Sequence, residues 1–196
     1  MPKGQKTRGR IVAQALKDAS VVGLEGLSLG EVAEKVKMSK SGLFAHFGSK
    51  EELQLQVLAH AAERFREVVI LPAFKEPRGV PRLSALFERW LAWGSDPSIP
   101  GGCVFTHAAV ELDDQPGRVR DQLAEWQRQW RDTLAKAAAL AVEERHFRPD
   151  LDTHQFAFQM FGIVLAYYHA GRLLSDPDAG AQAHAAFDSL VAWASP

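Results

Sequence analysis

Residues 28–53 read SLGEVAEKVKMSKSGLFAHFGSKEEL, and this stretch decides the fold of the first quarter of the chain. Ser28 and Glu31 form a capping box, which predicts a short helix over residues 28–36. The two residues after it form a turn, and a second short helix follows over about residues 39–46. Two short helices around a tight turn are the helix-turn-helix arrangement.

Patterns outside this stretch predict helices throughout the rest of the chain. An apolar stripe marks a helix over residues 7–23, and a second capping box, Ser49 with Glu52, starts a long helix that reaches about Leu71. Pro- and Gly-rich breaks separate further helices near residues 80–94, 102–112, 117–145, 151–175 and 179–194. Few runs alternate with a period of two, so the expected fold is all-α with about nine helices.

Charge divides the chain into two parts. Residues 1–50 hold nine Lys and Arg against four Asp and Glu, a net charge of +5. Residues 51–196 hold fourteen against twenty, a net charge of −6. A basic head on an acidic body suggests that the head meets a polyanion. We therefore expect two domains, a helix-turn-helix domain over residues 1–50 and a larger helical domain over residues 51–196.

Composition excludes several classes of protein. Apolar residues make up 46% and charged residues 24% of the chain, which is normal for a globular protein and unlike a disordered or collagen-like one. The one cysteine, Cys103, can form no intrachain disulfide, so we expect a reducing, cytoplasmic location. No apolar run is long enough to span a bilayer, and no apolar segment follows the basic N-terminus as a secretory signal requires.

The order and spacing of residues 7–55 resemble those of the TetR family of transcriptional regulators. The residues that carry the resemblance are Val32–Ala33, then Ser39–Lys40–Ser41–Gly42–Leu43–Phe44, and then Phe47, Lys50 and Leu53. Two positions depart from the family pattern. The family often has Tyr where this chain has Phe44, and usually has Gly in the turn where Lys37 stands. Lys37 must therefore adopt a strained backbone conformation, or the turn differs slightly.

The resemblance implies a ligand-responsive DNA-binding regulator, which as a repressor binds a palindromic operator in double-stranded DNA. Lys40 and Ser41 would reach base edges or phosphates, and His46 would point at the backbone or a base. Lys50 matches a phosphate-contacting lysine, and Thr7 can cap the first helix near a phosphate. The predicted DNA-binding residues are Thr7, Lys40, Ser41, Phe44, Ala45, His46 and Lys50, with a basic arm of Lys3, Lys6, Arg8 and Arg10.

Large aromatic side chains are dense in the body, with a few polar groups among them. Apolar walls with scattered polar groups are typical of a small-molecule site, so we expect a small hydrophobic or aromatic effector. The predicted ligand-binding residues are Trp90, Trp93, Cys103, Phe105, His107, Glu111, Trp126, Trp130, Phe161 and Tyr168. His107 and Glu111 lie one helical turn apart without a clear third ligand, so we expect no metal, and no cofactor is implied.

The last two predicted helices carry small and apolar side chains on one side. On helix 151–175 these are Phe158, Gly162, Leu165, Ala166, His169 and Leu173, and helix 179–194 adds Ala183, Ala186, Phe187, Leu190 and Trp193. A single recognition helix supplies few contacts, which implies two heads on one face of the duplex and hence a two-fold dimer. The family resemblance implies that these helices pair as a four-helix bundle. The other interpretation is an intrachain core.

Two other functions stay open at this point. The first is a DNA-binding dimer whose body meets a protein partner and no small ligand, which a tightly packed body without a cavity would favour. The second is an all-α enzyme that uses His107, Glu111 or His154. We expect no enzymatic activity, because an enzyme of this kind would leave the basic head without a role.

Overall fold

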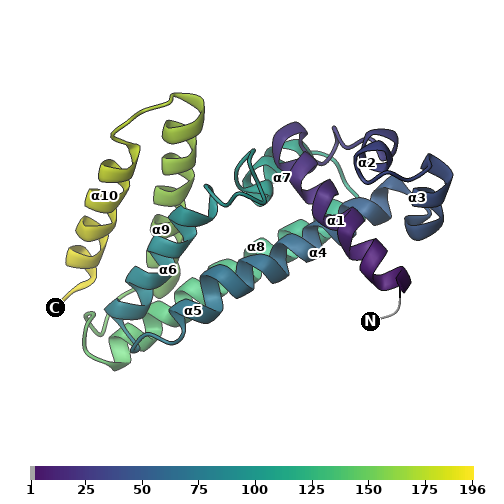
Figure 1. Cartoon of the computed structure of the whole chain (residues 1–196). Coiled ribbons are helices and arrows are strands. Elements are labelled where there is room, and N and C mark those ends of the chain that lie inside the picture. Colours follow the sequence, from purple (N-terminus) through teal and green to yellow (C-terminus); the bar gives the residue numbers. More distant parts are fainter. Residues whose placement is uncertain (1–2) are drawn as a thin grey trace. The chain divides into compact units, whose positions relative to one another are not determined.

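A computed structural model describes residues 3–196, with the exception of the side chain of Lys3 (Figure 1). Within this range the regular elements are ten α-helices and two π-helical segments, and no strand occurs. The elements are α1 Lys3–Val22, α2 Leu29–Lys35, α3 Lys40–Phe47, α4 Lys50–Phe65, η1 Arg66–Ile70, α5 Leu71–Ala73, α6 Val80–Trp93, α7 Val104–Leu112, α8 Arg118–Glu143, α9 Thr153–Tyr168, η2 His169–Leu173 and α10 Ala179–Ala194. Because α4, η1 and α5 join end to end, as do α9 and η2, the described chain has nine continuous helical stretches. The predicted all-α fold is confirmed.

The chain packs as two compact units. Unit 1 contains the residues up to Phe65 together with Ser95–Trp126, and unit 2 contains Arg66–Gly94 together with Gln127–Pro196. The helix-turn-helix segment therefore packs in one body with α7 and the first part of α8. No described helix is long and apolar enough to cross a membrane.

Helix α1 starts earlier than the sequence pattern indicates. It begins at Lys3, so Thr7 lies inside the helix, and its prediction as an N-terminal cap is wrong. An N-cap residue has an extended backbone outside the helix, which a residue in the second turn cannot adopt. The predicted apolar stripe is confirmed, because Ile11, Ala15 and Ala19 are fully buried.

The turn between α2 and α3 has a left-handed residue that is not glycine. Lys37 has φ of +56°, so of the two alternatives left open by the sequence the structure has the strained backbone. The amide of Lys37 donates to the carbonyl of Glu34 at 3.0 Å, and the amide of Met38 donates to that of Ala33 at 2.9 Å. These two bonds are the Schellman motif that ends many helices, and they hold the turn although a lysine stands where glycine is usual.

A proline explains why the long fourth helix changes to π geometry. Pro72 has no N–H to donate to the carbonyl of Val68, and its ring clashes with a carbonyl four residues back in an α-helix. The wider turn of η1 immediately before it relieves this clash. A guanidinium nitrogen of Arg89 lies 3.5 Å from the Val68 carbonyl oxygen and donates to it.

The core of unit 2 includes much of the inner face of α10. Helices α9 and α10 lie side by side in Figure 1, and Phe187 stacks on Phe87 of α6 at 4.2 Å between ring centroids. Ala183, Phe187 and Leu190 are all buried within the single chain. Their assignment to a dimer surface is therefore wrong, since an apolar helix face has the same pattern whether it meets its own chain or a second copy.

Replacing Lys37 by Gly should stabilise unit 1. A left-handed backbone costs an L-residue about 1–2 kcal/mol, and part of that gain is offset because glycine loses more chain entropy on folding. We expect Lys37→Gly to raise the free energy of unfolding by about 0.5–1 kcal/mol in urea titrations. Lys37→Ala is the matched control, since it removes the same charge and keeps Cβ. Equal effects of the two variants would contradict the strain at this turn.

Candidate nucleic-acid interface

Helix α3 has one face in the core and one face in solvent. Leu43 is fully buried and Phe47 is 6% exposed, so these two side chains, four residues apart, anchor the helix. The remaining side of this eight-residue helix faces outward. Of the predicted DNA-binding residues on α3, Lys40, Ser41, Phe44 and Ala45 are exposed and His46 is half-buried.

Caps at both ends fix the length of α3. The hydroxyl oxygen of Ser39 accepts a hydrogen bond from the amide of Gly42 at 3.1 Å and lies 3.2 Å from the hydroxyl of Ser41. At the other end, Gly48 has φ of +74° and its amide donates to the carbonyl of Phe44 at 2.7 Å. The exposed face is thus presented on a short helix with defined ends, narrow enough for the major groove of B-form DNA.

Phe44 is the large apolar side chain on this exposed face. Its ring is 51% exposed, and a phenyl ring can neither donate to nor accept from a phosphate. An aromatic edge or face can instead contact a thymine methyl group or a sugar. This position therefore offers apolar contact where a tyrosine hydroxyl would offer a hydrogen bond.

Lys50 lies at the start of α4, beside the cap of that helix. The hydroxyl oxygen of Ser49 accepts from the amide of Glu52 at 3.0 Å. The ammonium group of Lys50 donates to the backbone carbonyl of Glu25 and lies 3.8 Å from the Glu25 carboxylate. A lysine at a helix N-terminus is well suited to hold a phosphate, because the first backbone amides of the helix also attract anions.

The basic residues of α1 differ in how far they are free to meet DNA. Arg10 donates to the carbonyl of Val36 at 3.0 Å and so braces the turn before α3. Arg8 lies 5.1 Å from the centre of the Phe47 ring and 3.8 Å from the carboxylate of Glu52. Lys6 is exposed, whereas the side chain of Lys3 lies outside the described part of the structure.

A second ion pair fixes α2 against α1. The ammonium group of Lys35 donates to the carboxylate of Asp18 at 2.8 Å, and this hydrogen bond raises the pKa of Lys35 above its ordinary value. Asp18 also accepts from the amide of Gln14 at 3.0 Å. Lys35 therefore stabilises the packing of α2 against α1. The sequence alone does not distinguish it from a lysine that faces solvent.

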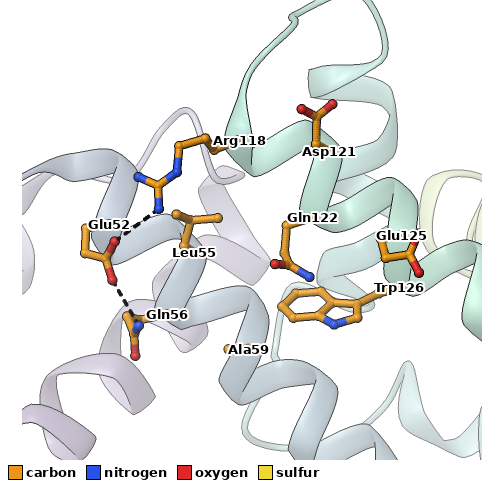
Figure 2. A pocket seen from close by; sticks show the side chains of 9 residues that line it. All are labelled: Glu52, Leu55, Gln56, Ala59, Arg118, Asp121, Gln122, Glu125 and Trp126. Carbon is orange, nitrogen blue, oxygen red and sulfur yellow. Dashed lines mark hydrogen bonds and ion pairs between the residues drawn. The ribbon is translucent and has the colours of Figure 1, made fainter.

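A groove of about 560 Å³ lies between the first turns of α4 and α8 in unit 1. Figure 2 shows Arg118 reaching the carboxylate of Glu52 at one end, and Trp126, a predicted ligand contact, at the other. Arg118 also donates to Glu51 at 3.1 Å. Since Arg8 approaches Glu52 as well, this carboxylate links α1, α4 and α8 at the base of the head.

The ten predicted ligand-binding residues are divided equally between the two units. In unit 2, the Trp90 ring packs edge-on against Trp130 and Phe161, each at 5.1 Å, and the Tyr168 hydroxyl donates to the Trp90 carbonyl at 2.6 Å. Trp93 is buried in the same unit. Unit 1 contains the other five, Cys103, Phe105, His107, Glu111 and Trp126, of which Phe105 and Trp126 are in ring contact at 6.4 Å.

Glu111 has a structural contact that the sequence did not reveal. Its carboxylate accepts from the backbone amide of Leu24 at 2.8 Å, which joins α7 to the segment after α1. Gln54, likewise overlooked, is only 4% exposed and donates to the carbonyl of Leu24 at 2.9 Å. A single signal was available for Gln54, a polar residue on the apolar face of α4. Among the described residues, no group of three or more metal-ligating side chains occurs.

Two family models match the chain. One, described as bacterial regulatory proteins of the tetR family, matches residues 11–57. The other, described as the tetracyclin repressor-like C-terminal domain, matches residues 79–187, which is more than half of the chain. The chain belongs to the TetR family. The family identified from residues 7–55 is therefore confirmed, and with it the class of DNA-binding transcriptional regulators that are not enzymes.

Relatives of this TetR-family protein match it over most of its length. The HTH-type transcriptional repressor KstR2 of Mycobacterium tuberculosis is 24% identical over 184 residues, which cover 89% of this chain and 88% of KstR2. A TetR transcriptional regulator from Chloroflexus aurantiacus J-10-FL is 26% identical, with a TM-score of 0.87 over 98% of this chain and 96% of that one. The fold of AibR, solved in complex with isovaleryl coenzyme A and operator DNA, is similar over 94% and 96% of the chains, with a TM-score of 0.71 and 24% identity.

Lys50→Ala should weaken binding to all DNA sequences alike. Each phosphate contact contributes about 0.9 to the slope of log affinity against log salt, so the slope should flatten by about one for each head. Fluorescence anisotropy with a labelled duplex at several salt concentrations measures both quantities. Lys75→Ala, which removes an exposed lysine from unit 2, is the control and should leave the slope unchanged. An unaltered slope in Lys50→Ala would remove Lys50 from the interface.

Proposed function

We propose that this protein is a ligand-responsive repressor that binds a palindromic operator as a homodimer. The observation that supports it best is the exposed face of α3 beside the capped N-terminus of α4, on a head with a net charge of +5. The name of KstR2 as a repressor favours repression as the direction of control. In this proposal residues 1–50 bind DNA, and residues 51–196 bind the effector and form the dimer.

The proposed DNA contacts fall into two groups by chemistry. Lys40 and Ser41 begin α3 and would meet base edges, together with apolar contacts from Phe44 and Ala45. Lys50 would hold a phosphate, and His46 and Thr7, both partly exposed, are proposed as further contacts. Phosphate contacts fix the register of the protein on the duplex, whereas base contacts select the sequence.

The proposed dimer surface is the outer side of α9 and η2. All six of its predicted members on these elements are exposed, namely Phe158, Gly162, Leu165, Ala166, His169 and Leu173. Phe158 is 59% and Leu173 71% exposed, and large apolar side chains in solvent mark an interaction surface. From α10, Ala186 and Trp193 are also exposed and would complete a four-helix bundle across a two-fold axis.

The proposed effector is a small hydrophobic or aromatic molecule. The ring cluster around Trp90 in unit 2, with Trp130 and Phe161 edge-on to it, is the apolar environment that would attract such a ligand. The effector would release the operator only if it binds the released state more tightly than the DNA-bound state. Its coupling to DNA is reciprocal, so operator DNA would weaken effector binding by the same factor.

Selection from genomic fragments tests the proposed function. The wild-type dimer should enrich fragments beside its own gene that contain an inverted repeat, with half-sites about 34–36 Å apart on one face of the duplex. Lys40→Ala should change the ratio of affinities for different half-sites by about tenfold. The affinity for a duplex of random sequence should change less. An equal loss for every sequence would assign Lys40 to a phosphate, and no enrichment by the wild type would refute the function.

Gly162 allows a direct test of the proposed dimer surface. A Cβ added at this position would meet nothing within 4 Å in the single chain, so a larger side chain fits the monomer. In a close helix pair the same side chain would overpack, and we expect Gly162→Leu to weaken the dimer at least about tenfold in analytical ultracentrifugation. Gly162→Ala, which also favours helix and stays small, should remain dimeric. A fully dimeric Gly162→Leu would place the interface elsewhere.

A further inference from the structure

The segment after α1 brings a carboxylate against Lys50, the lysine proposed to hold a DNA phosphate. Lys50 donates to the backbone carbonyl of Glu25 at 2.5 Å, and its ammonium group lies 3.8 Å from Oε2 of the same residue. The side chains are 39% and 47% exposed, so both remain accessible from solvent. One residue therefore orients Lys50 through its carbonyl and opposes its charge through its carboxylate.

The Glu25 carboxylate is fixed by a second contact. The amide nitrogen of Gln54 donates at 2.9 Å to Oε1 of Glu25 and at 2.9 Å to the carbonyl of Leu24. Gln54 is almost fully buried, so its amide cannot move away from these partners into water. The oxygen of Glu25 that Gln54 leaves free is the one closest to Lys50.

The backbone that carries Glu25 is fixed as well. Glu111 of α7 accepts from the amide of Leu24 at 2.8 Å, and Gln54 of α4 donates to the carbonyl of the same residue. Side chains from two helices therefore hold this segment. Gly23 makes the approach possible, because it has φ of +80° and a Cβ there would lie 1.5 Å from the Glu111 carboxylate. The position of the Glu25 carboxylate is thus set by the packing of unit 1.

We propose that Glu25 competes with DNA phosphate for Lys50 and so limits the affinity of the head for DNA of any sequence. A phosphate that approaches the ammonium group also approaches the carboxylate, well within the screening distance of about 8 Å at physiological salt. The two anions repel each other, and the ion pair that Lys50 already makes is weakened on binding. This inference rests on the proposed contact between Lys50 and phosphate.

The competition has a consequence for specificity. Because Lys50 reads no base, its phosphate contact strengthens operator and random DNA equally. Restraining that contact lowers the amount of protein held on the excess of nonspecific sites in a genome. Glu25 would therefore set the affinity of the head for DNA of any sequence, while α3 would still select the base sequence.

Glu25→Gln tests the competition, because a glutamine keeps an oxygen for Gln54 and loses the charge. We expect a three- to tenfold gain in affinity for a duplex of arbitrary sequence at low salt, about the size of one charge pair near a surface. The salt dependence should steepen by up to about one for each head. Glu34→Gln is the matched control, since it removes one exposed carboxylate from α2 of the same head. An equal gain in both variants would reduce the effect to net charge and overturn the proposal.

A double-mutant cycle identifies Lys50 as the target. In a Lys50→Ala background, Glu25→Gln should gain no more than Glu34→Gln does, because the side chain that Glu25 restrains is absent. A gain that persists without Lys50 would overturn the proposal. Urea titrations of each variant identify any that unfold. Glu25→Asp shortens the side chain and keeps the charge, so it should show at most half of the gain in DNA affinity that Glu25→Gln shows.

Failure of the inference and failure of the proposed function give different results. If wild-type protein binds no duplex at any salt concentration, the function is refuted. If wild-type protein binds and Lys50→Ala binds less, but Glu25→Gln equals the wild type, the competition alone is refuted. Arbitrary duplex DNA serves as the probe throughout, so the experiment does not depend on knowing the operator.

Discussion

Everything the head does depends on burying Leu43 and Phe47. A helix of eight residues is too short to be stable alone in water, and it persists here because two side chains on one face are in the core. The same burial determines which residues face outward, since side chains between these anchors must point the other way. Caps from Ser39 and Gly48 then fix where the helix begins and ends.

Positive charge in the head is shared between two tasks. Lys35 is held by Asp18, and Arg10 is held by the Val36 carbonyl, so both stabilise the packing of α1 against α2 and the turn. Lys40 and Lys50 are the lysines proposed to contact a duplex, but Lys50 also contacts Glu25. The nine basic residues of the head are therefore not all available to phosphate, because some of them are held by carboxylates or carbonyls of the head itself.

Aromatic density in the body was visible in the sequence, but its arrangement was not. Trp90, Trp130 and Phe161 gather in unit 2, whereas Phe105 and Trp126 meet in unit 1. Likewise, Phe187 has the spacing of an interface residue and packs against Phe87 of its own chain. Periodicity identifies the apolar face of a helix, and it carries no information about the identity of the surface that covers that face.

The sequence by itself determined the all-α fold, the helix-turn-helix segment and the TetR family, because capping boxes, helical spacing and breakers act between residues near in the chain. Only the tertiary structure decided that Gln54, Glu111 and Lys50 converge on Leu24 and Glu25. These partners are separated by 25 to 87 positions. Hydrogen bonds over such separations form only after packing has brought the helices together, and no local pattern records them.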